Sequence, residues 1–123
     1  MLDAGLLVSI DRGEAQAREF VTLARRRDHR LQTTHPVVAQ VWRDGARQAR
    51  LAAFLKRLRI HPFDNGIAVG RLLAETDTSD VVDAHLVLTA ARLGDAVLTG
   101  DTDDLSLLAT PLGPVAPTVH AWP

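Results

Sequence analysis

The pattern of apolar and polar positions along the chain predicts amphipathic helices separated by short apolar segments. Residues 14–27 have apolar side chains at helical spacing and end in three arginines, which suit a helix C-terminus. A further helix is predicted over 80–92, where Gly94 ends it. The clearest pattern covers 46–59 and predicts a helix with one apolar face, formed by Leu51, Phe54, Leu55 and Leu58.

Short apolar runs between these helices predict buried strands. They lie at the chain start, around Leu2 and 6–8, at 31–33, 59–63 and 96–99, and at an edge strand around Val115 and Val119. Helix N-caps are predicted at Thr34, Asp64 and 78–79. Alternating strands and helices predict an α/β fold, a three-layer α/β/α sandwich with a central, mostly parallel sheet. Ligands of such sheets bind beyond the carboxyl ends of the strands.

Composition narrows the class of protein. With 123 residues, 46% of them hydrophobic, we expect one domain spanning 1–123. The chain has no cysteine, which excludes disulfides and thiolate metal sites. It has neither a signal-peptide pattern nor an apolar run of ~18 residues, so we expect a soluble cytoplasmic protein with no membrane segment.

Charge is divided unequally along the chain although the formal net charge is only −1. Residues 1–59 hold 12 Lys and Arg against 6 Asp and Glu, whereas residues 60–123 hold 2 against 9. This division predicts a basic surface beside an acidic pocket. Such an arrangement suits a protein that binds a polyanion and cleaves it with the help of a metal cation. Arg43, Arg47 and Arg50 recur at helical spacing and are predicted to contact phosphates, with an ordinary solvated helix face as the alternative.

Acidic residues gather where the predicted strands end and the next helices begin. Asp3 and Asp101 follow apolar runs, the second within the stretch LTGDTDDL (98–105). Asp80 and Asp83 share one face at the start of a helix, where Asp80 alone is also explained by the helix dipole. Carboxylates converging at one sheet edge would repel one another unless a hard cation lay between them. Oxygen ligands without cysteine indicate Mg²⁺ or Mn²⁺ rather than zinc.

Three short motifs that contain these acidic residues together resemble the PIN domain. They are Asp3-Ala4-Gly5, Asp83-Ala84 and Leu98-Thr99-Gly100-Asp101, and their order covers nearly the whole chain. The short single-domain layout is similar to the VapC-type toxins of toxin–antitoxin pairs. The resemblance implies a metal-dependent ribonuclease that cleaves RNA, forms a homodimer and is held inactive by a cognate antitoxin.

The resemblance also assigns site residues. Asp3, Asp83 and Asp101 match the metal-binding and catalytic acids of the family. Asp104 stands where a further acidic residue often follows, although Asp103 could take its place. The Thr99 hydroxyl matches a group that orients a carboxylate or a phosphate.

Gln40 departs from the family pattern, because the family usually has a glutamate at this point of its second helix. An amide brings no charge and cannot act as a base. Either Asp80 supplies the missing charge, or the metal site is weaker, or catalysis has been lost. The last alternative would leave a non-catalytic protein- or RNA-binding module. A phosphoaspartyl hydrolase or receiver is disfavoured, because Gly5 follows Asp3 by two positions and the only lysine is Lys56.

Overall fold

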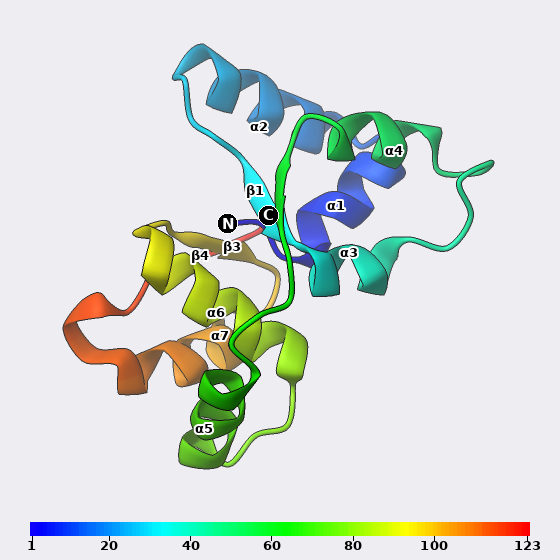
Figure 1. Ribbon diagram of the computed structural model, residues 1–123. Helices are drawn as coiled ribbons and strands as arrows, with labels where there is room; N and C mark the ends of the chain where they lie inside the picture. Colours follow the sequence, from blue (N-terminus) through cyan, green and yellow to red (C-terminus); the bar gives the residue numbers. More distant parts are fainter.

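The computed structural model describes residues 1–123 and alternates helices with short strands (Figure 1). The helices are α1 (Ala4–Asp11), α2 (Ala15–Arg26), α3 (His35–Val41), α4 (Ala49–Leu55), α5 (Gly66–Thr76), α6 (Val81–Leu93), α7 (Thr102–Ala109) and the 3₁₀ helix η1 (Thr110–Val115). The strands are β1 (Gln32–Thr34), β2 (Arg59–His61), β3 (Val97–Thr99) and β4 (Val119–Ala121).

The strands form two parallel pairs, which the chain start connects. β1 pairs with β2, and β3 pairs with β4, both in parallel. Leu2 lies between the two pairs: its amide donates to the Gln32 carbonyl at 2.7 Å, and it forms a parallel bridge with Leu98. The predicted α/β class with a parallel sheet is therefore confirmed. All five extended segments end at the same edge, which positions the candidate site.

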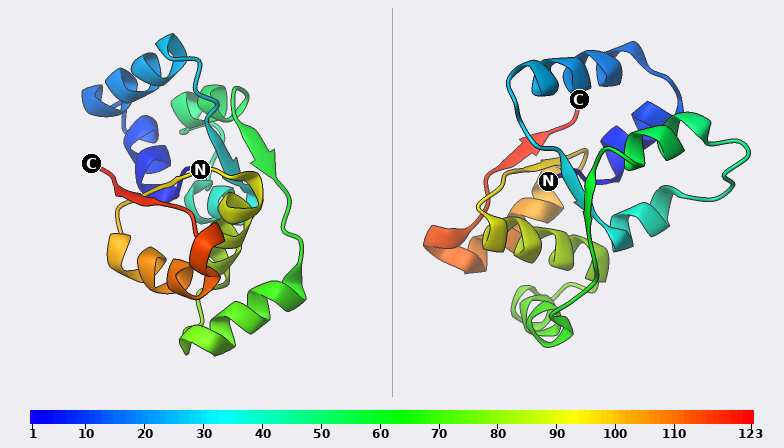
Figure 2. Two further views of the ribbon diagram at one scale, coloured as in Figure 1. Left: turned by 90° about the vertical axis from the view of Figure 1, so that its left-hand side faces the viewer. Right: turned by 45° about the horizontal axis from the view of Figure 1, so that its top comes forward.

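Helices lie on both sides of the strands, so the predicted three-layer arrangement is confirmed. Helices α1 to α4 gather on one side, and α5 to α7 gather on the other (Figures 1 and 2). One cluster of 20 buried apolar residues fills the interior, including Leu2, Leu6, Leu7, Leu51, Leu86, Val97 and Leu105. None of the helices has the length and apolar character needed to cross a lipid bilayer.

The chain start differs from the predicted strand. Only Leu2 pairs with a neighbouring strand, and the backbone enters helix α1 directly after Asp3. The apolar residues at 6–8 are helical because Leu6, Leu7 and Ile10 recur at a spacing that buries one face of α1. The strand predicted through residues 6–8 is therefore wrong, whereas the predicted burial of the segment is right.

The helix predicted over 46–59 is confirmed only in its central part, α4. The helix begins only after Gln48, later than predicted. The Gln48 side-chain oxygen accepts hydrogen bonds from the amides of Arg43 (2.7 Å) and Asp44 (2.9 Å), and these bonds hold the preceding residues in a turn. Leu51 and Phe54 are buried in the core as the apolar pattern predicts, and Leu55 and Leu58 pack against it.

Two of the three predicted helix caps are wrong. Thr34 caps α3 as predicted, its hydroxyl accepting from the Val37 amide. Helix α5 begins after Asn65, whose backbone is left-handed (φ 58°). Asp64 does not cap this helix, because its carboxylate contacts His85 and Arg92 instead. Helix α6 is capped by Asp80 rather than by the preceding hydroxyl residues, since a carboxylate oxygen is the stronger acceptor for an amide donor. The predicted edge strand is confirmed only as β4, because Val115 belongs to η1.

Asp95 fastens the chain start to the sheet. Its carboxylate accepts from the Met1 ammonium at 2.6 Å and from Gln32 Nε2 at 2.9 Å. Partial burial raises the pKa of Asp95, but these hydrogen bonds outweigh it and hold the pKa below its ordinary value. The stabilisation is therefore present above the unfolded-state pKa of about 3.9 and is lost as the pH falls through the lower folded value.

We expect Asp95→Asn to lower the free energy of unfolding by about 1 kcal/mol at pH 7, a value that allows for solvent screening of this partly exposed pair. Urea unfolding of the protein and the variant at pH 7 and at pH 3 measures the difference. The difference should shrink at pH 3, and a loss of equal size at both pH values would contradict the ionic origin of the contact.

Candidate functional site

Five carboxylates gather at the edge where the parallel strands end. Asp3 follows the bridged Leu2, and Asp101 follows β3, while Asp80, Asp83 and Asp104 come from the starts of α6 and α7. Asp80, Asp83 and Asp104 line one pocket of about 250 Å³. Asp3 and Asp101 are near enough to Asp83 to raise its pKa by charge repulsion. The structure thus brings together all five acids that the sequence selects.

Thr99 links two of these acids through its hydroxyl. Thr99 is fully buried at the end of β3, and its Oγ1 donates to Asp3 Oδ2 at 2.7 Å. The same oxygen accepts from the Asp101 amide at 3.0 Å. Because a hydroxyl offers one donor and two acceptor sites, both bonds form at once and fix the Asp3 carboxylate relative to the Asp101 backbone.

Trp122 supports this loop from behind, and no pattern in the sequence marks it. Its amide donates to the Thr99 carbonyl at 2.7 Å, and its ring lies 3.3 Å from the position that a Cβ on Gly5 would take. A Cβ on Gly100 would likewise meet the Trp122 carbonyl oxygen at 3.4 Å. The contact arises because β4 returns alongside β3, a pairing between segments distant in sequence. Gly5 and Gly100 therefore leave room for a tryptophan beside the acids.

Asp83 carries the largest perturbation at the site. It lies half-buried in the first turn of α6, and the Asp80 side chain accepts from its amide at 2.9 Å. Burial, followed by repulsion from Asp80, Asp3 and Asp101, raises the pKa of Asp83 to about 7. The raised pKa therefore reflects both the burial of Asp83 and the negative charge around it.

Asp101 caps helix α7 and also perturbs the neighbouring Asp104. Its carboxylate caps α7 by accepting from the Asp104 amide at 3.4 Å. A side-chain hydrogen bond with Asp101, together with its charge, raises the pKa of Asp104. Asp103 lies exposed in the first turn of the same helix. Asp101 and Asp104 are therefore electrostatically linked, as Asp80 and Asp83 are.

The cluster has no counterion within the protein. The ion pairs of the chain involve Asp44, Asp64 and Asp95, and none of the five clustered acids takes part in one. No three carboxylate or imidazole side chains stand close enough to enclose an ion as they are. The chemistry of the donor set nevertheless fits a hard divalent cation, because its ligands would be carboxylate oxygens whose mutual repulsion a cation would relieve.

Gln40 belongs to helix α3 rather than to the segments that carry the five acids. It is exposed near the end of α3 and makes no hydrogen bond to any of the five acids. Asp80 lies beside Asp83, and that it supplies the charge missing at Gln40 stays a prediction.

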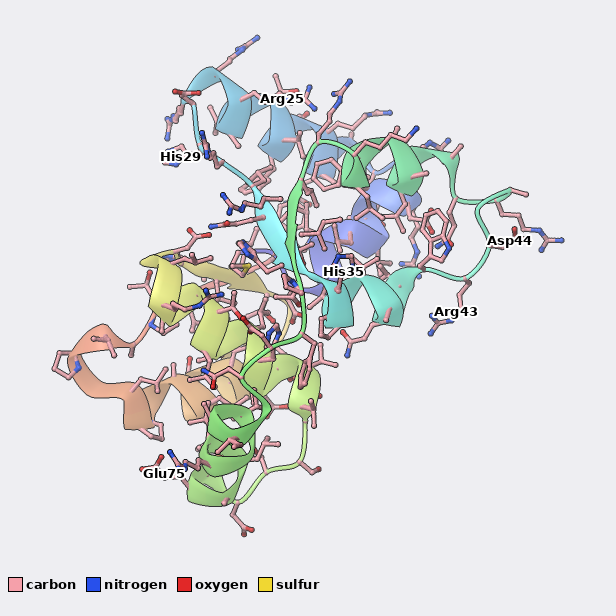
Figure 3. All side chains as sticks on the ribbon, viewed as in Figure 1. Arg25, His29, His35, Arg43, Asp44 and Glu75 are labelled. Atoms are coloured by element: carbon pink, nitrogen blue, oxygen red, sulfur yellow. The ribbon has the colours of Figure 1, made fainter.

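Arg43, Arg47 and Arg50 do not share one helix face, so that prediction is wrong. Arg43 follows α3, Arg47 lies in the turn held by the Gln48 side chain, and only Arg50 belongs to α4. Arg43 donates to two backbone carbonyls at the C-terminus of α3, from a loop that projects from the molecule (Figure 3). Arg47 pairs with Asp44 at 3.7 Å, and Arg50 reaches the Asp11 carbonyl at 3.4 Å. Their contact with phosphate stays a prediction.

We expect Thr99→Val to lower the free energy of unfolding by about 1–3 kcal/mol, because the variant leaves the buried Asp3 carboxylate without its donor. Thr99→Ser is the matched control, since it keeps the hydroxyl and removes only a methyl group. Urea unfolding measures both variants. A loss in Thr99→Ser with none in Thr99→Val would show that packing of the methyl group, not the hydroxyl, matters at this position.

The parallel sheet, its two helix layers and the acids at its carboxyl edge define a PIN-like α/β fold. The chain is similar over 100% of its length to a chain, 98% covered, in the crystal structure of VapBC2 from Rickettsia felis bound to a DNA fragment from their promoter. The TM-score is 0.73, with 17% sequence identity. No protein-family model matches the sequence, and no curated protein matches it either. At this identity the likeness shows the fold, and the activity has to be argued from the site.

Proposed function

We propose that this chain is a metal-dependent endoribonuclease that hydrolyses RNA phosphodiester bonds. One observation carries the proposal: five carboxylates without counterions gather at the carboxyl edge of a PIN-like sheet, where burial, followed by repulsion from neighbouring acids, raises the pKa of Asp83 to about 7. Such a field repels a phosphate as strongly as it attracts a cation. RNA can therefore reach this edge only when a cation has neutralised it.

Asp3, Asp83 and Asp101 would hold the ion, Mg²⁺ or Mn²⁺, with Asp80 and Asp104 completing the negative shell. A bound divalent ion supplies Lewis acidity toward the phosphodiester and lowers the pKa of water. Thr99 keeps the Asp3 oxygen in place, and the α7 cap fixes Asp101. These contacts preorganise the acids, which limits the cost of ordering them when the ion binds.

We further propose that the chain is the toxin of a type II toxin–antitoxin pair. Three motifs resemble VapC-type toxins, and the fold is similar to that of a chain in the VapBC2 structure. On this proposal the protein acts in the cytoplasm as a homodimer, and a cognate antitoxin restrains it.

A catalytically degenerate binding module is the second candidate. Gln40 favours it, because the glutamate usual in the family is missing and the exposed amide makes no hydrogen bond to the acids. The absence of a closed three-ligand arrangement favours it as well.

Incubation of the protein with total RNA and with transfer RNA tests the first candidate. We expect cleavage with Mg²⁺ or Mn²⁺ and none with a chelator. Calorimetric titration with Mn²⁺ runs beside the assay. No cleavage of any RNA, combined with no detectable metal binding, would contradict the nuclease and favour the binding module.

A further inference from the structure

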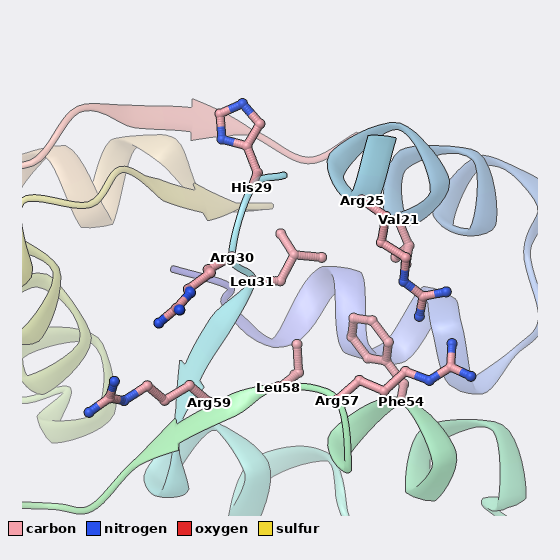
Figure 4. Close-up of a pocket in the computed structure, with 9 residues that line it drawn as sticks. All are labelled: Val21, Arg25, His29, Arg30, Leu31, Phe54, Arg57, Leu58 and Arg59. Atoms are coloured by element: carbon pink, nitrogen blue, oxygen red, sulfur yellow. The ribbon is translucent and has the colours of Figure 1, made fainter. Parts of the chain in front are cut away.

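An arginine-lined pocket lies on the other side of the molecule from the acids. It has a volume of about 390 Å³ and opens between α2, β1, α4 and β2 (Figure 4). Four guanidinium groups surround it, those of Arg25, Arg30, Arg57 and Arg59, and no carboxylate is among the residues that line it. Its floor is apolar and is formed mainly by Leu31, Phe54 and Leu58.

These four arginines have no partner within the chain. None of them takes part in an ion pair. The arginine side chains that donate hydrogen bonds are those of Arg43 and Arg50, which lie elsewhere. The four charges reinforce one another around the pocket, and Arg59 also lowers the pKa of the nearby His61, after the larger effect of its burial. The pocket is therefore a site of uncompensated positive charge.

The order of groups across the pocket is basic, apolar, basic. Figure 4 shows Arg25 and Arg57 pointing toward each other on one side, and Arg30 and Arg59 together on the other. Leu31, Leu58 and the ring of Phe54 lie between the two pairs. A nucleic-acid strand repeats charge in the same order, because each base lies between two phosphates.

The pocket and the acids occupy opposite edges of the sheet. Arg30 precedes β1 and Arg57 precedes β2, whereas Asp3 and Asp101 follow strand segments. The strands are parallel within each pair, and Leu2 links the two pairs, so segments before a strand and after a strand lie at opposite edges. Strands of three residues separate the two edges by only ~10 Å.

We propose that this pocket binds the backbone of single-stranded RNA, with its two arginine pairs on successive phosphates and one base against the apolar floor. The inference rests on the proposed function, because the acidic edge repels RNA and attraction has to come from another surface. Guanidinium groups suit this task, since they bind phosphate oxygens in a fork and stack on bases. An acidic peptide is the competing ligand, but the alternation of charge across the floor matches it less well.

Binding of a fluorescently labelled oligouridine, followed by anisotropy in a chelating buffer, tests the proposal without any cleavage. The pocket variant is Arg25→Gln/Arg57→Gln. Arg12→Gln/Arg71→Gln is the matched control, because it removes two exposed arginines outside the pocket. We expect the pocket variant to bind at least about tenfold more weakly at low salt. The plot of log K against log salt concentration should become less steep by about 0.7, since the variant removes the arginine pair assigned to one phosphate and each phosphate contact contributes ~0.7 on a single strand.

The control variant should bind within about twofold of the unaltered protein. Equal weakening in both variants would overturn the proposal, because it would reflect net charge alone. Unchanged RNA binding by the pocket variant, with loss of binding to a labelled oligoglutamate, would overturn it in favour of an acidic peptide. Circular dichroism establishes that both variants are folded.

The proposed RNA-binding pocket and the proposed nuclease activity can be contradicted independently of each other. RNA binding that depends on the pocket, without cleavage when metal is added, would contradict the proposed nuclease activity and support the proposed binding pocket. Metal-dependent cleavage by a pocket variant that binds RNA as the unaltered protein does would remove the pocket and leave the nuclease.

Discussion

Asp101→Asn is expected to slow metal-dependent RNA cleavage by roughly a hundredfold to a thousandfold, equivalent to about 3–4 kcal/mol of transition-state stabilisation. The substitution removes one charge from the group of carboxylates that would hold the ion. It keeps a side-chain oxygen that can accept from the Asp104 amide, and asparagine caps helices about as well as aspartate. The loss should therefore appear in cleavage and not in the fold.

Asp103→Asn is the matched control for this prediction. Asp103 lies two residues away in the first turn of α7, is exposed, and does not contribute to the raised pKa of Asp83 as Asp101 does. We expect it to retain cleavage within about threefold. Initial rates on one RNA substrate, with thermal unfolding of each variant, measure both effects. If Asp101→Asn cleaved as fast as the unaltered protein, Asp101 would have no part in holding the ion.

Much of the fold follows from local patterns that the sequence displays. Thr34 before Pro36 marks the start of α3, and Gly94 with φ 66° ends α6 as predicted. The same reasoning fails at residues 6–8, where an apolar run fits a strand and a buried helix equally well. Tertiary packing decides such cases, because one face of α1 lies against α3 and α4.

The acids of the candidate site could be selected from sequence because each of them follows a strand or begins a helix. Trp122 and the arginine pocket could not be selected in this way. Trp122 meets Thr99 only after β4 pairs with β3, and Arg25 and Arg57 line one pocket only after α2 and α4 both pack against α1. The prediction for Arg43, Arg47 and Arg50 was wrong because helical spacing gives a shared face only where the chain is helical throughout.

Asp83→Asn is expected to stabilise the metal-free protein above neutral pH. The folded-state pKa of Asp83 is about 7, whereas an unfolded aspartate titrates near 3.9. Because the folded value is the higher one, ionised Asp83 destabilises the native state, and the penalty grows as the pH rises from about 4 to 7. A shift of this size would correspond to ~4 kcal/mol for a buried group. Asp83 is only half-buried, so solvent screening reduces the expected gain to about 2 kcal/mol, or roughly 5–10 °C in Tm.

The pH dependence of that gain separates charge relief from better packing. Thermal unfolding in a chelating buffer should show the full gain at pH 8, a smaller one near pH 6 and none near pH 4, where both forms are uncharged at this position. Saturating Mn²⁺ should reverse the order, because the unaltered protein gains the binding free energy of the ion and the variant gains less. A gain that is constant with pH would contradict the raised pKa. A gain that persists unchanged in Mn²⁺ would show that the acids repel one another without holding a cation between them.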